Sequence, residues 1–210
     1  MRPGNDPRWL FSPLVAFGIV ALLFAAPLSP VLYAAHQNAP QAPICREMLV
    51  NGGFEEGATG WSQSSVGGYN LISNFHPHTG SLGAYLGGVN EADDRLSQQI
   101  NIPTGVISAT LRFWWAISTE EPGLGFDRMT VTLRRPDGTP LADLATIDSS
   151  AAENLWDQAE FDLTGYAGQS VVLEFHATTD ATNLTDFYVD DASLGVCLAP
   201  TAIYLPIVLR

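Results

Sequence analysis

Runs in which apolar and polar residues alternate fill most of the chain between Cys45 and Cys197, and helical periodicity is almost absent there. Successive side chains of a β-strand point to opposite faces, so this period of two predicts strands that each bury one face. In the run 111–117, for example, the odd-numbered Leu, Phe, Trp and Ile share one face, whereas Trp114 lies on the other. The alternation therefore predicts an all-β fold.

Turn residues separate the alternating runs. The segment Pro136-Asp-Gly-Thr139 stands between two of them and is typical of a hairpin turn. Short strands with one apolar face each pair into two antiparallel sheets that pack as a sandwich, although the alternation does not give the strand order. Besides 111–117, we expect strands near residues 45–50, 69–73, 81–87, 96–102, 128–134, 141–148, 155–163, 171–178 and 186–196.

The two cysteines of the chain, Cys45 and Cys197, lie at the two ends of this strand-rich region. An isolated pair in an oxidising compartment is usually bridged. A bridge here brings the ends of the domain together and, in the chain-entropy model, stabilises it by roughly 5 kcal/mol at most. We therefore predict a disulfide between them.

The amino-terminal segment has the pattern of a secretory signal peptide. Arg2 and Arg8 precede an apolar run at 14–26, and small residues follow at Ala34 and Ala35. The run is shorter than the roughly 20 residues that span a bilayer. Read together with its flanks, the apolar stretch is long enough for an uncleaved anchor, which stays the alternative and is the one route by which we expect a membrane contact.

These features divide the chain into four segments. We expect a signal peptide with its helix at 1–35, a linker at 36–44, the β-sandwich at 45–197 and an apolar carboxyl-terminal tail at 198–210. The tail contains two prolines and is too short to span a membrane. It is interpreted as a sorting or surface-attachment signal; the alternative is an extra edge strand or a disordered apolar tail.

The chain is strongly acidic, with a formal net charge of −13 and no lysine. Such a surface repels phosphate backbones, which argues against a nucleic-acid partner. Carboxylates suit calcium, which prefers oxygen ligands, although the charge can also serve solubility alone.

Two motifs near the ends of the expected sandwich carry a family resemblance. The stretch Leu49-Val-Asn-Gly-Gly-Phe-Glu55, followed by Gly60-Trp61, resembles the opening of bacterial carbohydrate-binding-module-like jelly rolls, the galactose-binding-like domains. The stretch Phe187-Tyr-Val-Asp-Asp-Ala-Ser-Leu194 resembles their close. The resemblance implies a jelly-roll sandwich of the kind attached to secreted hydrolases and peptidases. Such domains bind sugars, mediate adhesion or act as spacers, and the fold alone does not choose among these.

The resemblance also implies a structural calcium ion where the two motifs meet. Carried over by position, its ligands are Glu55 and Asp190 or Asp191. Neighbouring residues of a strand point to opposite faces, so we expect only one of the two aspartates to be a ligand and favour Asp190. The alternative is that the aspartate pair forms a solvated edge that discourages strand pairing.

An outward-facing tryptophan is the best candidate for sugar binding, because sugar rings present apolar C–H faces. Alternation places Trp114 opposite the apolar face of its strand. If the neighbouring strands are central, we expect Arg112, Arg128 and His176 to share its surface. The alternative is that a loop or the second sheet covers Trp114.

No motif of a nucleophile elbow, a zinc protease, a phosphate loop or a dinucleotide site is present, so we expect no catalysis. The sequence predicts a non-catalytic module, secreted or on the cell surface, that binds a polysaccharide or cell-envelope glycan and holds a structural calcium. The alternative is a structural or adhesive envelope protein without a small-molecule ligand.

Overall fold

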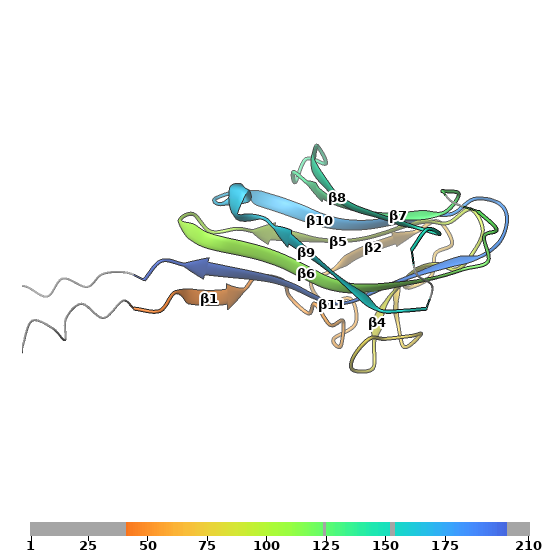
Figure 1. Ribbon diagram of the computed structural model, residues 1–210, viewed down its shortest axis with the longest axis horizontal. Coiled ribbons are helices and arrows are strands. Elements are labelled where there is room, and N and C mark those ends of the chain that lie inside the picture. The colour runs from red at the N-terminus through yellow and green to blue at the C-terminus, as the bar shows by residue number, and fades with distance from the viewer. Residues whose placement is uncertain (1–40, 124, 152–153, 201–210) are drawn as a thin grey trace, which may run out of the picture. The chain divides into compact units, whose positions relative to one another are not determined.

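The computed structural model describes residues 41–200 apart from residues 124 and 152–153. The expected signal peptide with its helix, most of the linker and the tail beyond residue 200 lie outside the described residues. The described chain forms two antiparallel sheets that face each other (Figure 1). The prediction of an all-β, two-sheet antiparallel sandwich is confirmed.

The six-stranded sheet, called sheet A here, contains the longest strands. In spatial order it consists of β3 (Ile72–Ser73), β4 (Gly83–Gly87), β11 (Thr185–Leu198), β6 (Val106–Thr119) and β9 (Asp157–Asp162), and β1 (Ile44–Glu47) also pairs with β11. β6 and β11 run antiparallel, from the pair Thr119 and Thr185 at one end to Val106 and Leu198 at the other.

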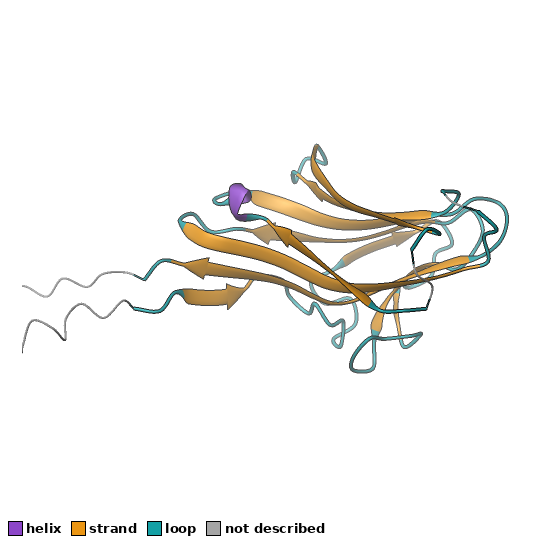
Figure 2. Ribbon diagram, in the orientation of Figure 1, coloured by secondary structure: helices purple, strands orange, loops and turns teal. Residues whose placement is uncertain are grey.

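The five-stranded sheet, called sheet B, covers the other side of the core. In spatial order it consists of β2 (Ser62–Ser65), β5 (Asp93–Asn101), β10 (Ser170–Thr178), β7 (Arg128–Arg134) and β8 (Pro140–Asp148). The short 3₁₀ turn η2 (Thr164–Tyr166) is the helical segment of the described chain and precedes β10 (Figure 2). No helix of the described residues is both long and apolar enough to cross a bilayer.

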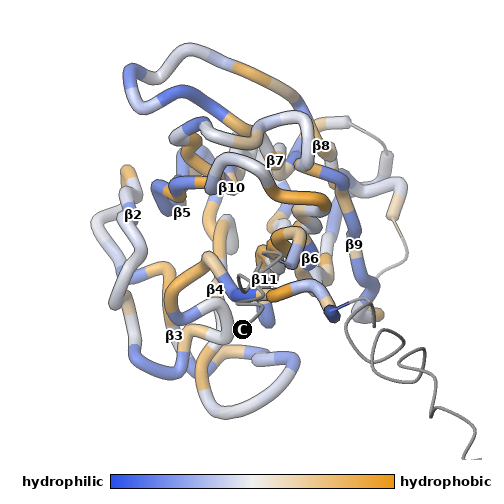
Figure 3. The backbone as a smooth tube through the Cα atoms, turned by 90° about the vertical axis from the view of Figure 1, so that its left-hand side faces the viewer, coloured by the Kyte–Doolittle hydropathy of each residue, from blue (hydrophilic) through white to orange (hydrophobic). Residues whose placement is uncertain are grey.

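The core fills the space between the sheets because every second residue of the central strands points inward. Viewed end-on, hydrophobic segments line the interior between the two layers (Figure 3). Trp61 is buried and packs against Phe54 at 5.1 Å and Phe175 at 6.2 Å between ring centroids. The main inward residues of β6 and β10 are Leu111, Phe113, Ile117, Val171, Leu173, Phe175 and Ala177.

Strand β1 joins the start of the sandwich to its last strand. Cys45 and Cys197 face each other across β1 and β11, with Cα atoms 4.0 Å apart, and form a disulfide. β1 is shorter than the expected strand at 45–50 because the chain leaves sheet A after Glu47 and passes to β5 of sheet B. Val50 there bonds through both its N–H and its C=O to the side chain of Gln98.

The hairpin expected at Pro136-Asp-Gly-Thr139 connects β7 and β8. Asp137 Oδ1 accepts a hydrogen bond from the N–H of Thr139 at 2.9 Å. Gly138 has a φ of 86°, which glycine adopts without strain. Local turn chemistry therefore specifies this connection.

Candidate functional site

Aromatic side chains gather on the outer face of sheet A. Tyr188 of β11 lies opposite Tyr85 of β4, and two positions further along, Asp190 lies opposite Trp114 of β6. Alternate residues of a strand share a face, so these side chains project from the same side of the sheet. The aromatic cluster consists of Phe75, His76, His78, Tyr85, Trp114, Trp156 and Tyr188.

The connection between β3 and β4 crosses this face and covers Trp114. The ring of His78 stacks on Trp114 with centroids 4.2 Å apart and planes 17° apart. His76 stacks on Trp156 at 5.6 Å in the same way. Trp114 is therefore half-buried beneath a loop. This is the alternative to an exposed sugar-binding ring that the sequence analysis gives for Trp114.

Two aspartates of β11 hold this loop in place. Asp190 Oδ2 accepts hydrogen bonds from the N–H groups of His78 and Thr79 at 2.8 and 3.1 Å, and its Oδ1 accepts one from the N–H of Asp191 at 2.7 Å. Asp191 Oδ1 accepts a hydrogen bond from the hydroxyl of Thr79 at 2.8 Å, and its Oδ2 lies 2.7 Å from Nδ1 of His78. The carboxylates thus replace the backbone partners that the irregular loop lacks.

Glu55 holds the same loop from the other side. Its Oε1 accepts hydrogen bonds from the N–H groups of Ser81 and Leu82 at 2.8 and 2.9 Å. Gly80 has a φ of 65°, which favours glycine, and a side chain there would also displace the carboxylate of Glu55. We call Glu55, Asp190 and Asp191 the carboxylate clasp.

The carboxylate clasp contains the three residues that the sequence predicts as calcium ligands. They meet at one loop, as expected of residues from the two ends of the domain, but they meet through N–H and hydroxyl donors and His78. Burial raises the pKa of Asp190, and the charge of Asp191 adds to the rise, whereas the N–H donors lower it. Calcium binding by these residues stays a prediction.

The expectation that Asp190 and Asp191 point to opposite faces is wrong. The register between β11 and β6 shifts between Asp190 and Ser193, which marks a β-bulge, and Asp191 has a φ of 47°. The bulge turns both carboxylates toward the same loop. Gly52 packs against it, since its C=O accepts the N–H of Ala192 and a Cβ there would lie 1.7 Å from the carbonyl oxygen of Ala192.

An open hollow of about 340 Å³ lies beside the aromatic cluster, over the edge strands of sheet A. Phe75 at its rim is 56% exposed and packs on Tyr85 with centroids 5.1 Å apart. The hollow is lined by Tyr69, Asn70, Ser73, Phe75, Tyr85, Gly87, Gly88 and Val89. The sequence analysis predicts an exposed aromatic ring for sugar binding at Trp114, and the structure has such a ring at Phe75 instead.

Carboxylates fix the tyrosines around the hollow. Asp186 accepts hydrogen bonds from the hydroxyls of Tyr85 at 2.8 Å and Tyr188 at 3.2 Å, and burial together with Asp186 raises the pKa of both phenols. The Tyr69 hydroxyl donates to Asp94 Oδ2 at 2.6 Å. Burial and this bond raise the pKa of Tyr69 to about 12. The rings are therefore held in fixed orientations.

The four predicted ligand residues do not share a surface, so that prediction is wrong. Trp114 and Arg112 belong to β6 of sheet A, whereas Arg128 and His176 belong to β7 and β10 of sheet B. Alternation assigns faces within a strand but not the sheet to which the strand belongs, and the outward faces of the two sheets lie on opposite sides of the sandwich.

Two of these residues, Arg112 and His176, have carboxylate partners. Arg112 Nε lies 2.7 Å from Glu160, and His176 Nε2 lies 2.9 Å from Asp93 Oδ1. The outer face of sheet B carries a network in which Arg95 and Arg134 both contact Glu174. Arg128 is exposed at the start of β7. Their roles in ligand binding stay predictions.

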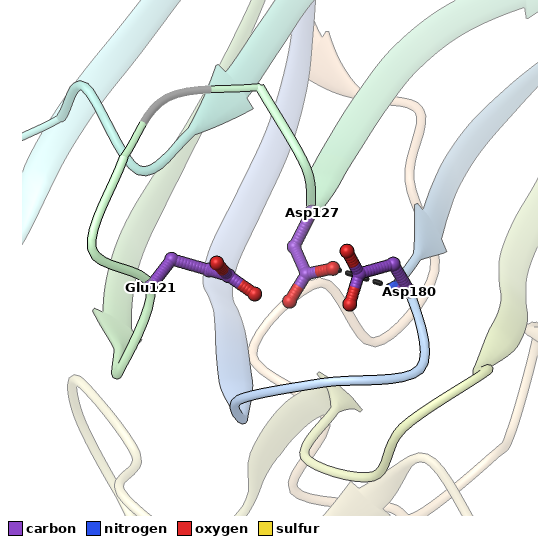
Figure 4. Close-up of side chains that lie close together, drawn as sticks. All are labelled: Glu121, Asp127 and Asp180. Atoms are coloured by element: carbon purple, nitrogen blue, oxygen red, sulfur yellow. Dashed lines mark hydrogen bonds between the residues drawn. The ribbon is translucent and has the colours of Figure 1, made fainter.

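A second group of acidic residues lies in the connections at one end of the sandwich. Glu121 follows β6, Asp127 precedes β7 and Asp180 follows β10 (Figure 4). One oxygen from each of the three lies within 4.8 Å of the others, an arrangement that can hold a metal ion. Sequence reasoning missed this group, which we call the acidic triad, because 53 residues separate Asp127 from Asp180 and only the pairing of β10 with β7 brings them together.

Comparison by sequence finds a relative in two strains of Vibrio cholerae. No protein-family profile matches the chain. Over 139 residues it is 30% identical to the pre-pro-metalloprotease PrtV of Vibrio cholerae, an alignment that covers 60% of this chain. The chain spans only 14% of the length of that relative. The similarity is therefore to one part of a protease precursor.

Solved structures identify the fold. The chain superposes on the carbohydrate-binding module TmCBM61, determined with β-1,4-galactotriose, with a TM-score of 0.54, 17% identity and coverage of 71% of this chain and 97% of that one. This chain has the fold of a carbohydrate-binding module. The CBM22 tandem domain of Paenibacillus barcinonensis Xyn10C matches with a TM-score of 0.50 and 18% identity, over 78% of this chain and 50% of that one. The carbohydrate-binding-module-like resemblance of the sequence is thus confirmed at the level of the fold.

Proposed function

We propose that the chain is a non-catalytic module that binds carbohydrate in the hollow beside Phe75. The observation that carries the proposal is an exposed aromatic ring at the rim of a recess of about 340 Å³, on a carbohydrate-binding-module fold. A ligand site is usually such a recess, with apolar walls and a few polar groups that fix orientation.

The chemistry of the recess suits a sugar. Phe75 and Tyr85 offer ring faces for the apolar C–H side of a pyranose, and Asn70 offers both donors and acceptors for hydroxyls. The net charge of −13 disfavours acidic glycans, so the preferred ligand is a neutral polysaccharide or cell-envelope glycan. In this reading Trp114 supports the loop that presents Phe75 rather than forming the platform itself.

The disulfide supports a place of action outside the cytoplasm. Reducing compartments keep cysteines as free thiols, whereas Cys45 and Cys197 form a disulfide here. Similarity to a pre-pro-metalloprotease is consistent with an extracellular protein. We therefore propose a secreted or cell-surface location for the module.

A glycan array followed by affinity electrophoresis tests the function. Phe75→Ala removes the exposed ring, and we expect binding roughly fivefold to tenfold weaker. Phe126→Ala is the matched control, because Phe126 is 57% exposed, against 56% for Phe75, and does not line the hollow. Trp114→Ala tests the tryptophan that the sequence analysis gives as the candidate for sugar binding.

Three outcomes separate the hypotheses. Loss of binding in Phe75→Ala, but not in Phe126→Ala, supports the hollow. Loss only in Trp114→Ala moves the site to the ring under the loop. A folded wild-type chain that binds no neutral glycan, including β-1,4-galactan oligosaccharides, rules out the proposal and favours a structural or adhesive envelope protein.

A further inference from the structure

The acidic triad concentrates negative charge without an ion-pair partner among the described residues. Glu121, Asp127 and Asp180 carry three carboxylates, and none of them takes part in an ion pair of the described residues. Like charges this close repel one another, and the repulsion grows as burial excludes water. A bound cation would relieve this repulsion.

Asp127 shows most directly that a partner is missing. Its side chain is fully buried, with 0% exposure, and Figure 4 shows its carboxylate between those of Glu121 and Asp180. Oδ1 accepts a hydrogen bond from the N–H of Asp180 at 2.7 Å, whereas Oδ2 has no hydrogen-bond partner in the described chain. Oε1 of Glu121 is buried and unpartnered in the same way. A buried charged oxygen without a donor is costly.

The neighbouring backbone is already ordered around the triad. The N–H of Glu120 bonds to the C=O of Leu184 at 2.8 Å, which links the two connections on either side of the group. Asp180 Oδ1 caps the next turn by accepting the N–H of Thr182 at 2.7 Å. Asp180 thus lies in a hydrogen-bonded turn, and Glu121 follows a residue that is bonded to the β10–β11 connection.

The oxygen donors of the triad suit calcium better than smaller or softer ions. Calcium takes six to eight oxygen ligands, and carboxylates are among those it prefers. The three oxygens of the triad lie within 4.8 Å of one another. Mg²⁺ demands shorter bonds of about 2.1 Å and keeps its waters, whereas Zn²⁺ favours nitrogen and sulfur, which this group does not offer.

We propose that Glu121, Asp127 and Asp180 bind a calcium ion that fastens the β6–β7 connection to the β10–β11 connection. The site shares no residue with the hollow or with the carboxylate clasp. It lies beyond the Thr119–Thr185 end of the β6–β11 pair, whereas the disulfide lies near the opposite end, where Cys197 faces Ser108. The disulfide thus links β1 to β11 at one end of sheet A, and the calcium ion links two connections at the other end.

Calcium titration of the full chain tests the site. The protein is stripped with EGTA, and its melting temperature and calorimetric binding isotherm are measured with CaCl₂ and with MgCl₂. At a hundredfold excess over the dissociation constant we expect calcium to raise the melting temperature by roughly 5–10 °C. Asp127→Asn removes the response, and Glu121→Gln, which changes a less buried ligand, weakens calcium binding at least tenfold.

Two control variants make the result specific. Glu120→Gln changes an exposed neighbouring acid outside the triad, and Glu55→Gln changes the carboxylate clasp. Retention of calcium binding by both supports the proposal. It is overturned if the stripped wild type binds no calcium, if magnesium has the same effect as calcium, or if Glu121→Gln binds calcium like the wild type while Glu55→Gln does not. Glu121→Gln decides these outcomes even if Asp127→Asn fails to fold.

Discussion

The carboxylate clasp and the acidic triad are two groups of three acidic side chains that use their oxygens in opposite ways. In the clasp, Glu55 and the two aspartates of β11 accept hydrogen bonds from the loop that they hold. In the triad, Asp127 Oδ2 and Glu121 Oε1 are buried without a donor. The carboxylates of the clasp thus have donors within the loop, whereas two buried oxygens of the triad have none in the described chain.

This difference shows that neither acidity nor proximity is enough to identify a metal site. What distinguishes the two groups is whether the lone pairs of buried carboxylates already have donors. The family resemblance implies calcium at the carboxylate clasp because the residues of the clasp lie in recognisable motifs. The hydrogen bonds favour the triad instead, and substitutions at the two sites should therefore behave differently.

The largest effect is expected at the clasp. Asp190→Ala leaves the N–H groups of His78, Thr79 and Asp191 without their acceptor, so we expect the free energy of unfolding to fall by about 4 kcal/mol. Urea denaturation measures it. Asp190→Asn retains one acceptor oxygen and should lose less. Equal stability of Asp190→Ala and wild type would show that the clasp does not hold the loop.

A smaller loss is expected when the frame of the clasp is disturbed. In Gly52→Ala the new Cβ meets the carbonyl oxygen of Ala192 at 1.7 Å, so the bulge that presents the two aspartates must shift. We expect a loss of about 2 kcal/mol in urea denaturation. Gly195→Ala is the matched control on β11, since nothing lies within 4 Å of a Cβ there. A similar loss in both variants would mean that glycine flexibility, not contact with the bulge, is responsible.

The same change from Asp to Asn should have opposite signs at the two sites. In EGTA at pH 7, Asp127→Asn replaces an unpartnered oxygen by an NH₂ group that can donate to Glu121 or Asp180, and Oδ1 keeps its bond to the N–H of Asp180. We expect the free energy of unfolding to rise by about 1 kcal/mol. Asp190→Asn loses stability under the same conditions. If both variants lose stability in EGTA, the contrast between the two sites is wrong.

The strands could be predicted because a period of two is a local signal, and the inward residues of β6 and β10 follow it. The bulge at Asp191 could not, because its φ of 47° depends on packing against Gly52 rather than on neighbouring residues. The separation of Trp114 from His176 and the formation of the triad both depend on strand order, which alternation does not encode. The meeting of Glu55 with the aspartates of β11 was expected, because these residues lie in recognisable motifs at the two ends of the domain.

Asp94 shares one feature with the carboxylate clasp and one with the acidic triad, and its substitution gives the smallest expected effect. It is fully buried; its Oδ2 accepts hydrogen bonds from the Tyr69 hydroxyl at 2.6 Å and the Gly87 N–H at 2.8 Å, whereas Oδ1 has no partner in the described chain. The pKa of Tyr69 is raised from 10.0 to about 12, so the folded state holds the phenol proton more tightly than the unfolded state does. The resulting stability is fully present below pH 10 and is lost as the pH rises toward 12.

Absorbance at 295 nm across an alkaline titration follows this ionisation. The difference between wild type and Tyr69→Phe isolates one phenol, which should ionise near pH 12. Asp94→Asn removes the carboxylate charge beside the hydroxyl, so Tyr69 should then ionise at lower pH. An unchanged titration in Asp94→Asn would mean that burial alone raises the pKa. Asp94 would then resemble the carboxylates of the acidic triad, because its hydrogen bonds would have no measurable effect on the groups around it.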